Sequence, residues 1–204
     1  MSGQTRLAQA PAGAFVWPVI ALLGLVVLVY IAVHRPGPAV VVSRPLPELN
    51  RTNLVRLQNF WCEAGHTNAF TGVLVEHYAS GALMSRSVVA NGLLNGLSEG
   101  WFTNGQIQVR ESYRDNVSDG LRTKWYPNGH KLSEATIVNG QIEGVFRRWH
   151  SDGSLAEEIP MHDGHQEGVG RAFYPNGYLA EEVEMRDGKV IHQQSWQPDD
   201  RKKL

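Results

Sequence analysis

The sequence predicts an all-β fold, a single twisted antiparallel sheet of consecutive β-hairpin repeats, preceded by one transmembrane α-helix. Two observations predict the sheet: glycines recur every 24 residues in separate series, and apolar residues alternate with polar ones between them. Glycine marks turns because it adopts positive φ without steric cost, and alternation is typical of half-buried strands. A third observation, a 20-residue apolar run near the N-terminus, predicts the helix.

The apolar segment 14–33 follows a short tail of residues 1–13 and contains no charged residue. At 1.5 Å per residue, 20 helical residues span roughly 30 Å, enough to cross a bilayer once. Trp17 and Tyr30 lie near its ends, where amphipathic rings favour the membrane interface. A cleaved signal peptide is the alternative, but its apolar core is normally only about 7 to 15 residues long. We expect a retained anchor, and flanking arginines on both sides leave its orientation open.

Residues 34–53 and 54–72 connect this segment to the repeats. The first stretch carries four prolines and a glycine, which predicts an extended linker. In the second, Leu54 to Trp61 is expected to form one strand that leads into Phe70-Thr71-Gly72. We expect 54–72 to be an incomplete unit that caps the N-terminal end of the sheet.

Residues 73–192 form five units of 24 residues, each predicted to be one hairpin. The sequence Tyr-Pro-Asn-Gly-His at 126–130 predicts a type I turn followed by a left-handed glycine. The glycines at this turn position are Gly81, Gly105, Gly129, Gly153 and Gly177. A second series at the same interval comprises Gly72, Gly96, Gly120, Gly144 and Gly168. A third comprises Gly92, Asn116, Gly140, Gly164 and Gly188, each preceded by Asn or Asp, residues that tolerate left-handed backbone.

The turn chemistry also predicts how the two strands of a hairpin pair. In the fourth unit it places Trp149 opposite Leu155, Val145 opposite Ile159, and Arg147 opposite Glu157. In the fifth it places Phe173 opposite Leu179, Val169 opposite Val183, and Arg171 opposite Glu181. Apolar residues then face apolar ones and acids face bases, so register and turn chemistry agree. Lys131 departs from this pattern in the third unit.

The segment GLRTKWYPNGHKLSEATIVNGQIEG (120–144) resembles the MORN-repeat variant, and the resemblance extends from Phe70 to about Trp196. Bacterial proteins with this repeat are commonly known as antitoxins of YwqK type. The resemblance implies a sheet of consecutive hairpins and a role in protein or membrane association. A transmembrane anchor does not suit an antitoxin that neutralises a cytoplasmic toxin.

Composition and spacing argue against other classes of function. With 19 basic and 20 acidic residues the chain has no bulk attraction for nucleic acid, so no nucleic-acid partner is expected. His162 and His165 flank a turn without a third metal ligand nearby in sequence. The doublet Glu157-Glu158 recurs one unit later, as expected for strand-facing partners of arginine. We therefore expect no enzyme activity, no catalytic or metal site, and no cofactor.

One series of residues is a candidate for partner binding. It lies one residue after the Trp101, Trp125 and Trp149 positions, so it is expected on the opposite face of the sheet. Its members are Tyr78, Phe102, Tyr126, His150 and Tyr174, which we call the aromatic stripe. These rings either stack on neighbouring units and cover that face, or form a groove for a protein.

The sequence thus predicts a membrane-anchored, non-catalytic scaffold that binds an unknown protein or a copy of itself through a sheet face or edge. A lipid-contacting module and an antitoxin-like protein are the alternatives. A charged C-terminal tail, 193–204, follows the repeats, and its segment Asp199 to Lys203 is expected to guard the open edge of the sheet after Trp196. Neither the partner nor the side of the membrane follows from the sequence.

Overall fold

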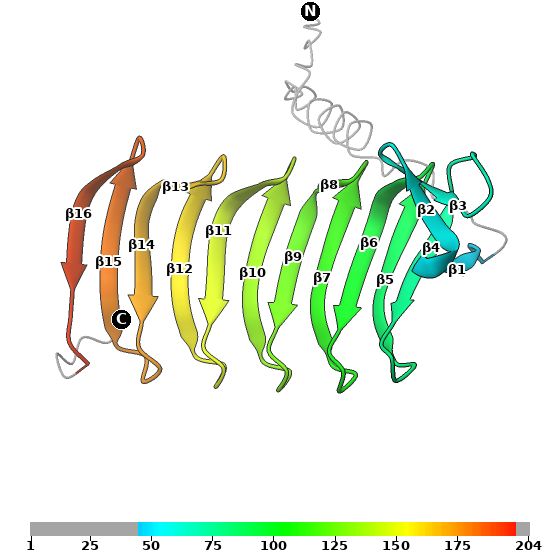
Figure 1. Ribbon diagram of the computed structural model, residues 1–204. Coiled ribbons are helices and arrows are strands. Elements are labelled where there is room, and N and C mark those ends of the chain that lie inside the picture. Colours follow the sequence, from blue (N-terminus) through cyan, green and yellow to red (C-terminus); the bar gives the residue numbers. More distant parts are fainter. Residues whose placement is uncertain (1–44, 199–204) are drawn as a thin grey trace, which may run out of the picture. The chain divides into compact units, whose positions relative to one another are not determined.

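The computed structural model describes residues 45–198, which form a 14-stranded β-sheet and a separate two-stranded sheet (Figure 1). The all-β prediction is confirmed for these residues. None of them lies in a helix that is long and apolar enough to cross a membrane. The expected N-terminal tail, the membrane helix 14–33 and the first part of the linker lie outside the described residues, as do 199–204.

The strands of the large sheet follow one another almost in chain order. Their order is β1-β4-β5-β6-β7-β9-β10-β11-β12-β14-β15-β16. The bounds are β1 Glu48–Asn50, β4 Gly72–His77, β5 Leu83–Ala90, β6 Leu93–Trp101, β7 Ile107–Arg114, β9 Gly120–Trp125, β10 Lys131–Val138, β11 Gln141–Trp149, β12 Leu155–His162, β14 Gly168–Phe173, β15 Leu179–Arg186 and β16 Lys189–Ser195. Two short strands, β8 (Val117–Ser118) and β13 (His165–Gln166), pair with β7 and β12. The pairing of β1 with β4 is parallel. The sheet is therefore mixed, whereas the sequence predicted a purely antiparallel one.

The turns of the first glycine series have the predicted geometry. The N–H of Gly129 donates to the carbonyl oxygen of Tyr126 at 2.9 Å, and the N–H of Tyr126 donates to that of His130 at 2.8 Å. Gly129 has a φ of +88°, and its equivalents in the other units also have positive φ. This is a type I turn followed by a left-handed residue. The five turn glycines therefore serve the structural role that was predicted for them.

The turns of the third series connect successive units and use two left-handed residues. Asn139 has a φ of +49° and Gly140 one of +86°, and the same pair of positive angles recurs in every unit. Two consecutive left-handed residues define a type I′ turn, whose twist matches that of the flanking strands. The turns of this series and those of the first series lie at opposite ends of the strands, which appear as the loops at the top and bottom of Figure 1.

The predicted strand register is right at the first pair of a hairpin and wrong beyond it. Trp149 lies opposite Leu155 as predicted, but Arg147 lies opposite Glu158 instead of Glu157. The cause is a β-bulge at Ala156, which places an additional residue on β12. A bulge shifts all later pairs by one residue, and the simple alternation of the sequence does not reveal it.

The same shift corrects the other predicted pairs. In the fourth unit, Val145 lies opposite Pro160 rather than Ile159. In the fifth unit, Phe173 lies opposite Leu179 as predicted. Beyond that pair, Val169 lies opposite Glu184 rather than Val183, and Arg171 lies opposite Glu182 rather than Glu181. In the third unit, Lys131 lies opposite Trp125, and its ammonium group is 4.8 Å from the centre of the Trp149 ring. The hairpin with the aberrant lysine therefore forms like the others.

The N-terminal cap differs from the predicted single strand. Leu54–Leu57 (β2) and Phe60–Glu63 (β3) form a hairpin of their own, with a positive φ at Gln58 between them. Residues 48–53, which were expected to belong to the linker, form β1 and a short 3-10 helix. The glycine at position 72 is required here, because a Cβ atom would lie 2.3 Å from the carbonyl oxygen of Pro47.

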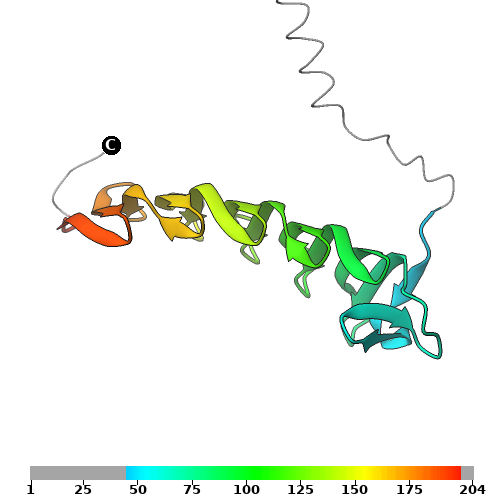
Figure 2. The ribbon, with the colours of Figure 1, turned by 90° about the horizontal axis from the view of Figure 1, so that it is seen from above.

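The main hydrophobic core lies between the cap and the first hairpin, β4 and β5. Its buried members are Leu54, Phe70, Leu74 and Val89, with Leu49, Trp61 and Leu94 packed against them. Beyond the cap and the strand β6 that contacts its core, strands β7 to β16 form a single layer, which is seen edge-on in Figure 2. No other described element covers either face of that layer. The two faces are therefore the natural places to look for function.

Candidate functional site

Side chains alternate along a strand, so each face of the sheet is defined by its residues. We call the face that carries Leu121, Arg147 and Trp149 the tryptophan face. The opposite face carries Glu111, Lys124 and Arg148.

The aromatic stripe is built into the contacts between units. The hydroxyl of Tyr126 donates to the carbonyl oxygen of Trp149 at 2.9 Å, and Tyr78 and Tyr174 make the equivalent bonds to Trp101 and Trp196. In the fourth unit the ring of His150 lies 2.8 Å from the carbonyl oxygen of Phe173. Each of these side chains thus satisfies a backbone group of the next unit.

All five residues of the aromatic stripe are half-buried. Phe102 and Tyr126 line a shallow pocket of about 550 Å³ together with Val109 and Lys124 of the opposite face. The stripe therefore leaves part of its surface open, while its polar atoms bind within the sheet. Partner binding by the stripe stays a prediction, and the contacts between units are what the structure adds.

The tryptophan face carries a row of exposed aliphatic side chains that the sequence did not single out as a site. Leu97, Leu121 and Val145 occupy equivalent positions in successive units, and their exposed fractions are 39%, 54% and 41%. Their cross-strand neighbours are smaller, with Ser112 opposite Leu97 and Thr136 opposite Leu121. We call these three large side chains the aliphatic row. The 24-residue spacing was the signal in the sequence, but alternation alone indicates a shared face and not whether anything covers it.

A row of paired charges lies beside the aliphatic row on the same face. Glutamates and arginines face each other across neighbouring strands, and the nitrogen-to-oxygen distances are 2.9 Å for Arg110 and Glu99, 2.8 Å for Arg147 and Glu158, and 3.0 Å for Arg171 and Glu182. Each of these three arginines has an acidic partner, so these pairs add no local excess of positive charge to the face. Exposed pairs of this kind contribute about 0.2–1 kcal/mol each, and less at high salt.

The opposite face contains a small polar network around Glu111. Its carboxylate accepts hydrogen bonds from Ser118, Tyr113 and Arg122. Burial alone would raise the pKa of Glu111, but these hydrogen bonds and the charge of Arg122 together lower it. Burial and the neighbouring carboxylate raise the pKa of Tyr113. Glu111 is thus held as a carboxylate and stabilises the sheet rather than offering a proton.

His162 lies in a cluster with Glu143 and Asp163, whose possible ligand atoms lie within 4.8 Å of one another. Both oxygens of Glu143 are already engaged, one with the His162 ring and one with the backbone N–H of Asp163, each at 2.9 Å. One unit later, Glu167 accepts from the N–H of Asp187 in the same way. The carboxylate at this position therefore holds the turn, and His165 is not a member of the cluster.

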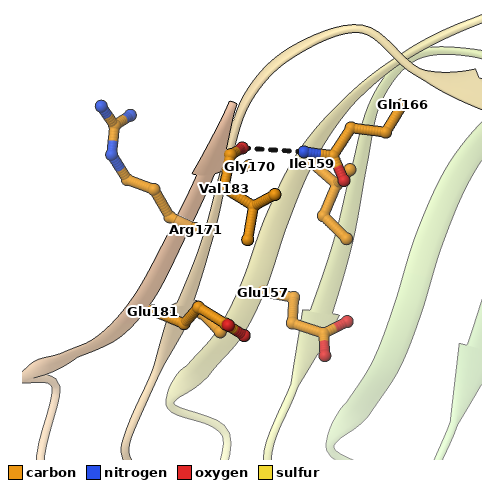
Figure 3. A pocket seen from close by; sticks show the side chains of 8 residues that line it. Glu157, Ile159, Gln166, Gly170, Arg171, Glu181 and Val183 are labelled. Carbon is orange, nitrogen blue, oxygen red and sulfur yellow. Dashed lines mark hydrogen bonds between the residues drawn. The ribbon is translucent and has the colours of Figure 1, made fainter. Parts of the chain in front are cut away.

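A second pocket of about 140 Å³ lies on the opposite face between β12, β14 and β15 (Figure 3). The side chain of Gln166 reaches across it and donates to the carbonyl oxygen of Val183 at 2.9 Å. Gly170 makes this possible, because a Cβ atom there would lie 2.7 Å from the Gln166 amide nitrogen. The carboxylate of Glu157 binds Arg148, and that of Glu181 accepts from Gln193. The repeated glutamates are therefore partners of strand neighbours, as predicted, although their register differs.

This arrangement defines a class of protein, a linear β-hairpin repeat with two alternating turn types and two open faces. Three consecutive segments, 94–115, 118–139 and 142–163, match the family model described as MORN repeat variant. The resemblance inferred from the sequence is confirmed for these three segments. No curated protein matches the chain significantly.

Proposed function

We propose that the chain is a non-catalytic repeat scaffold whose tryptophan face binds another protein. The observation that carries this proposal is the exposure of the aliphatic row. Large aliphatic side chains aligned on one face, beside charges that are already paired, are typical of surfaces that bind proteins. The repeat segments that match the MORN variant support a scaffold role.

The dimensions of the aliphatic row suit a protein segment. Neighbouring strands lie about 4.8 Å apart, so Leu97, Leu121 and Val145 are spaced about 10 Å from one another and span about 20 Å. The smaller side chains of Ser112 and Thr136 lie on the strands between these three residues, so the surface is lower there. A partner that inserts apolar side chains over these smaller residues would bury the row.

Contact with lipid is the less favoured alternative. Binding to an anionic bilayer needs a cluster of basic residues that are free to face it. Arg110, Arg147 and Arg171 of the tryptophan face instead bind glutamates of the neighbouring strands. The charge pattern therefore supports a protein partner over a membrane surface.

Anchoring by segment 14–33 belongs to the same proposal and rests on the sequence. Protease treatment of sealed membranes that contain the full-length chain tests it. Protection of one side of segment 14–33 supports the anchor and gives its orientation, whereas release of the whole chain by a high-salt wash contradicts it. An antitoxin-like role would make the bound protein a toxin, which identification of the partner decides.

Affinity capture with the full-length chain tests the binding face. The double variant Leu121→Asp and Val145→Asp places charge on the aliphatic row, and we expect it to lose partners that the natural chain recovers. Gln108→Asp is the matched control, because Gln108 is exposed and lines the pocket of the opposite face.

A third variant, Phe102→Ser with Tyr126→Ser, tests the aromatic stripe separately. Circular dichroism establishes that each variant keeps its sheet. If the double aspartate variant stays folded and recovers the same partners as the natural chain, binding by the tryptophan face is wrong.

A further inference from the structure

The last strand of the sheet, β16, has one edge that no described strand pairs with. It occupies the position of the first strand in a further unit. Tyr174 donates to the carbonyl oxygen of Trp196 as Tyr126 does to that of Trp149. In a complete unit, the second strand of the hairpin pairs with the edge that corresponds to the free edge of β16. The backbone of β16 is therefore shaped to receive one more antiparallel strand.

The backbone groups on this edge can be assigned. The N–H of Trp196 donates to the carbonyl oxygen of Ala180 at 2.9 Å, so Trp196 faces β15. In an antiparallel strand, the N–H and C=O of one residue point to the same side, and successive residues alternate. Gln194 therefore also faces β15, whereas the N–H and C=O groups of Gln193 and Ser195 point to the free edge.

The edge lacks most of the features that prevent strand addition. Proteins protect sheet edges with charged residues, prolines or very short strands. The segment Val190–Ser195 contains no Lys, Arg, Asp, Glu or Pro, and its one irregularity is a bulge between Val190 and His192. Val190 and Ile191 are 56% and 54% exposed. The strand is thus suited to pairing along its C-terminal half.

The other end of the sheet offers only a short edge strand. There β1, only three residues long, pairs with β4, and the N–H of Val73 donates to the carbonyl oxygen of Pro47 at 2.8 Å. Very short edge strands are a common protection. Head-to-tail growth of the sheet is therefore disfavoured, because β16 of one copy would have to pair with the three-residue β1 of the next.

We propose that two copies of the chain pair through their β16 strands, antiparallel across a two-fold axis. This pairing continues the interface by which successive units already bind each other, and the cap limits it to two copies. Centred on Gln194, the register lets Gln193 of one copy exchange backbone hydrogen bonds with Ser195 of the other. No Lys, Arg, Asp or Glu of β16 then faces a like charge. The tryptophan face remains available, so this proposal is independent of the proposed binding face.

Disulfide trapping in the full-length chain tests the register. Gln194→Cys is introduced together with Cys62→Ala, since Cys62 is the single native cysteine. Facing residues of such a non-hydrogen-bonded pair have Cα atoms about 4.5 Å apart, within the range of a disulfide. Mild oxidation is expected to give a covalent species of twice the chain mass. Ser151→Cys, in an exposed turn, is the control and is expected to give none.

A proline at position 193 tests whether backbone pairing causes the trapping. Gln193→Pro removes an N–H that points to the free edge and spares those that face β15, whereas Gln193→Ala keeps it. We expect the trapped dimer to be lost in the proline variant and retained in the alanine variant. Equal trapping in both variants, or equal trapping from Ser151→Cys, would overturn the proposal. Sedimentation of the unsubstituted chain is a separate check: a dimer supports the pairing, and a monomer at every concentration contradicts it.

Discussion

The hydroxyl of Tyr126 donates a hydrogen bond to the backbone carbonyl of Trp149, 23 residues further along the chain. Tyr78, His150 and Tyr174 hold equivalent positions and make the same kind of bond to a backbone carbonyl further along the chain, whereas Phe102 has no polar atom to do so. In repeat proteins, stability is approximately the sum of unit stabilities and of interfaces between neighbours. The aromatic stripe is therefore part of the interface term in this chain.

Removal of that hydroxyl should weaken the sheet measurably. Tyr126→Phe is expected to lower the free energy of unfolding by about 1 kcal/mol, because it removes one hydrogen bond and leaves the carbonyl half-buried. Phe102→Tyr is the reverse change at an equivalent position and is expected to be neutral or stabilising. Urea unfolding of both variants measures the difference. A Tyr126→Phe chain as stable as the natural one would contradict the role of the bond.

The left-handed turns predict which substitutions each turn tolerates. Gly140 has a φ of +86°, and the equivalent residue of the preceding unit is Asn116, with a φ of +69°. Gly140→Asn should therefore cost only a few tenths of a kcal/mol, whereas Gly140→Val should cost about 1–2 kcal/mol or more. Thermal unfolding monitored by circular dichroism compares the two. Equal losses from asparagine and valine would argue against a strained backbone at this turn.

The position of the core predicts an uneven response to truncation. Leu74, in the core between the cap and the first hairpin, is 4% exposed, and Leu121, in the single layer, is 54% exposed. Leu74→Ala should cost about 2–5 kcal/mol because it leaves a cavity. Leu121→Ala should lie within about 0.5 kcal/mol of the natural chain. Similar losses at the two positions would mean that the aliphatic row is covered in the isolated protein.

The pair of His162 and Glu143 predicts a pH dependence. The hydrogen bond that the His162 ring donates to the Glu143 carboxylate raises the pKa of His162 and lowers the pKa of Glu143. The histidine contribution to stability is present below its unfolded-state pKa and is lost as the pH rises through the folded-state pKa. The glutamate contribution is present above its unfolded-state pKa and is lost as the pH falls through the folded-state pKa.

The contribution of the pair is therefore greatest between the two ordinary values, near 4.5 for the glutamate and 6.5 for the histidine. NMR titration of the His162 ring measures its pKa. Substitution of Glu143 by Gln is expected to bring the pKa of His162 back toward its ordinary value. An unchanged titration would show that Glu143 does not hold the ring.

The sequence predicted the turns well because turn geometry depends on individual residues. Asn139 followed by Gly140 favours a turn of two left-handed residues, and Gly129 after Asn128 indicates a type I turn followed by a left-handed glycine. The predicted register is wrong beyond Ala156, because the β-bulge there depends on how two strands twist together. Nothing in the sequence around Ala156 indicates a bulge, so each later pair was predicted with a register error of one residue.

The cap and the binding surface were harder to predict for a different reason. The hairpin of β2 and β3 turns at Gln58, which takes a positive φ without the usual glycine or asparagine. The exposure of Leu121 depends on the absence of a second layer over the described sheet, which period-two alternation does not indicate. The hydrogen bond of Tyr126 also depends on a carbonyl of the next unit, so the sequence of one unit does not reveal it.

Site-specific photo-crosslinking tests the central claim most directly, because it reports which face touches another protein. A photoreactive amino acid replaces Leu121 in the full-length chain, or replaces Lys124, which lies on the same strand and faces the other way. The account predicts adducts with a distinct protein from position 121 and none from position 124. Adducts from position 124 alone, or equally from both positions, would contradict a binding site on the tryptophan face.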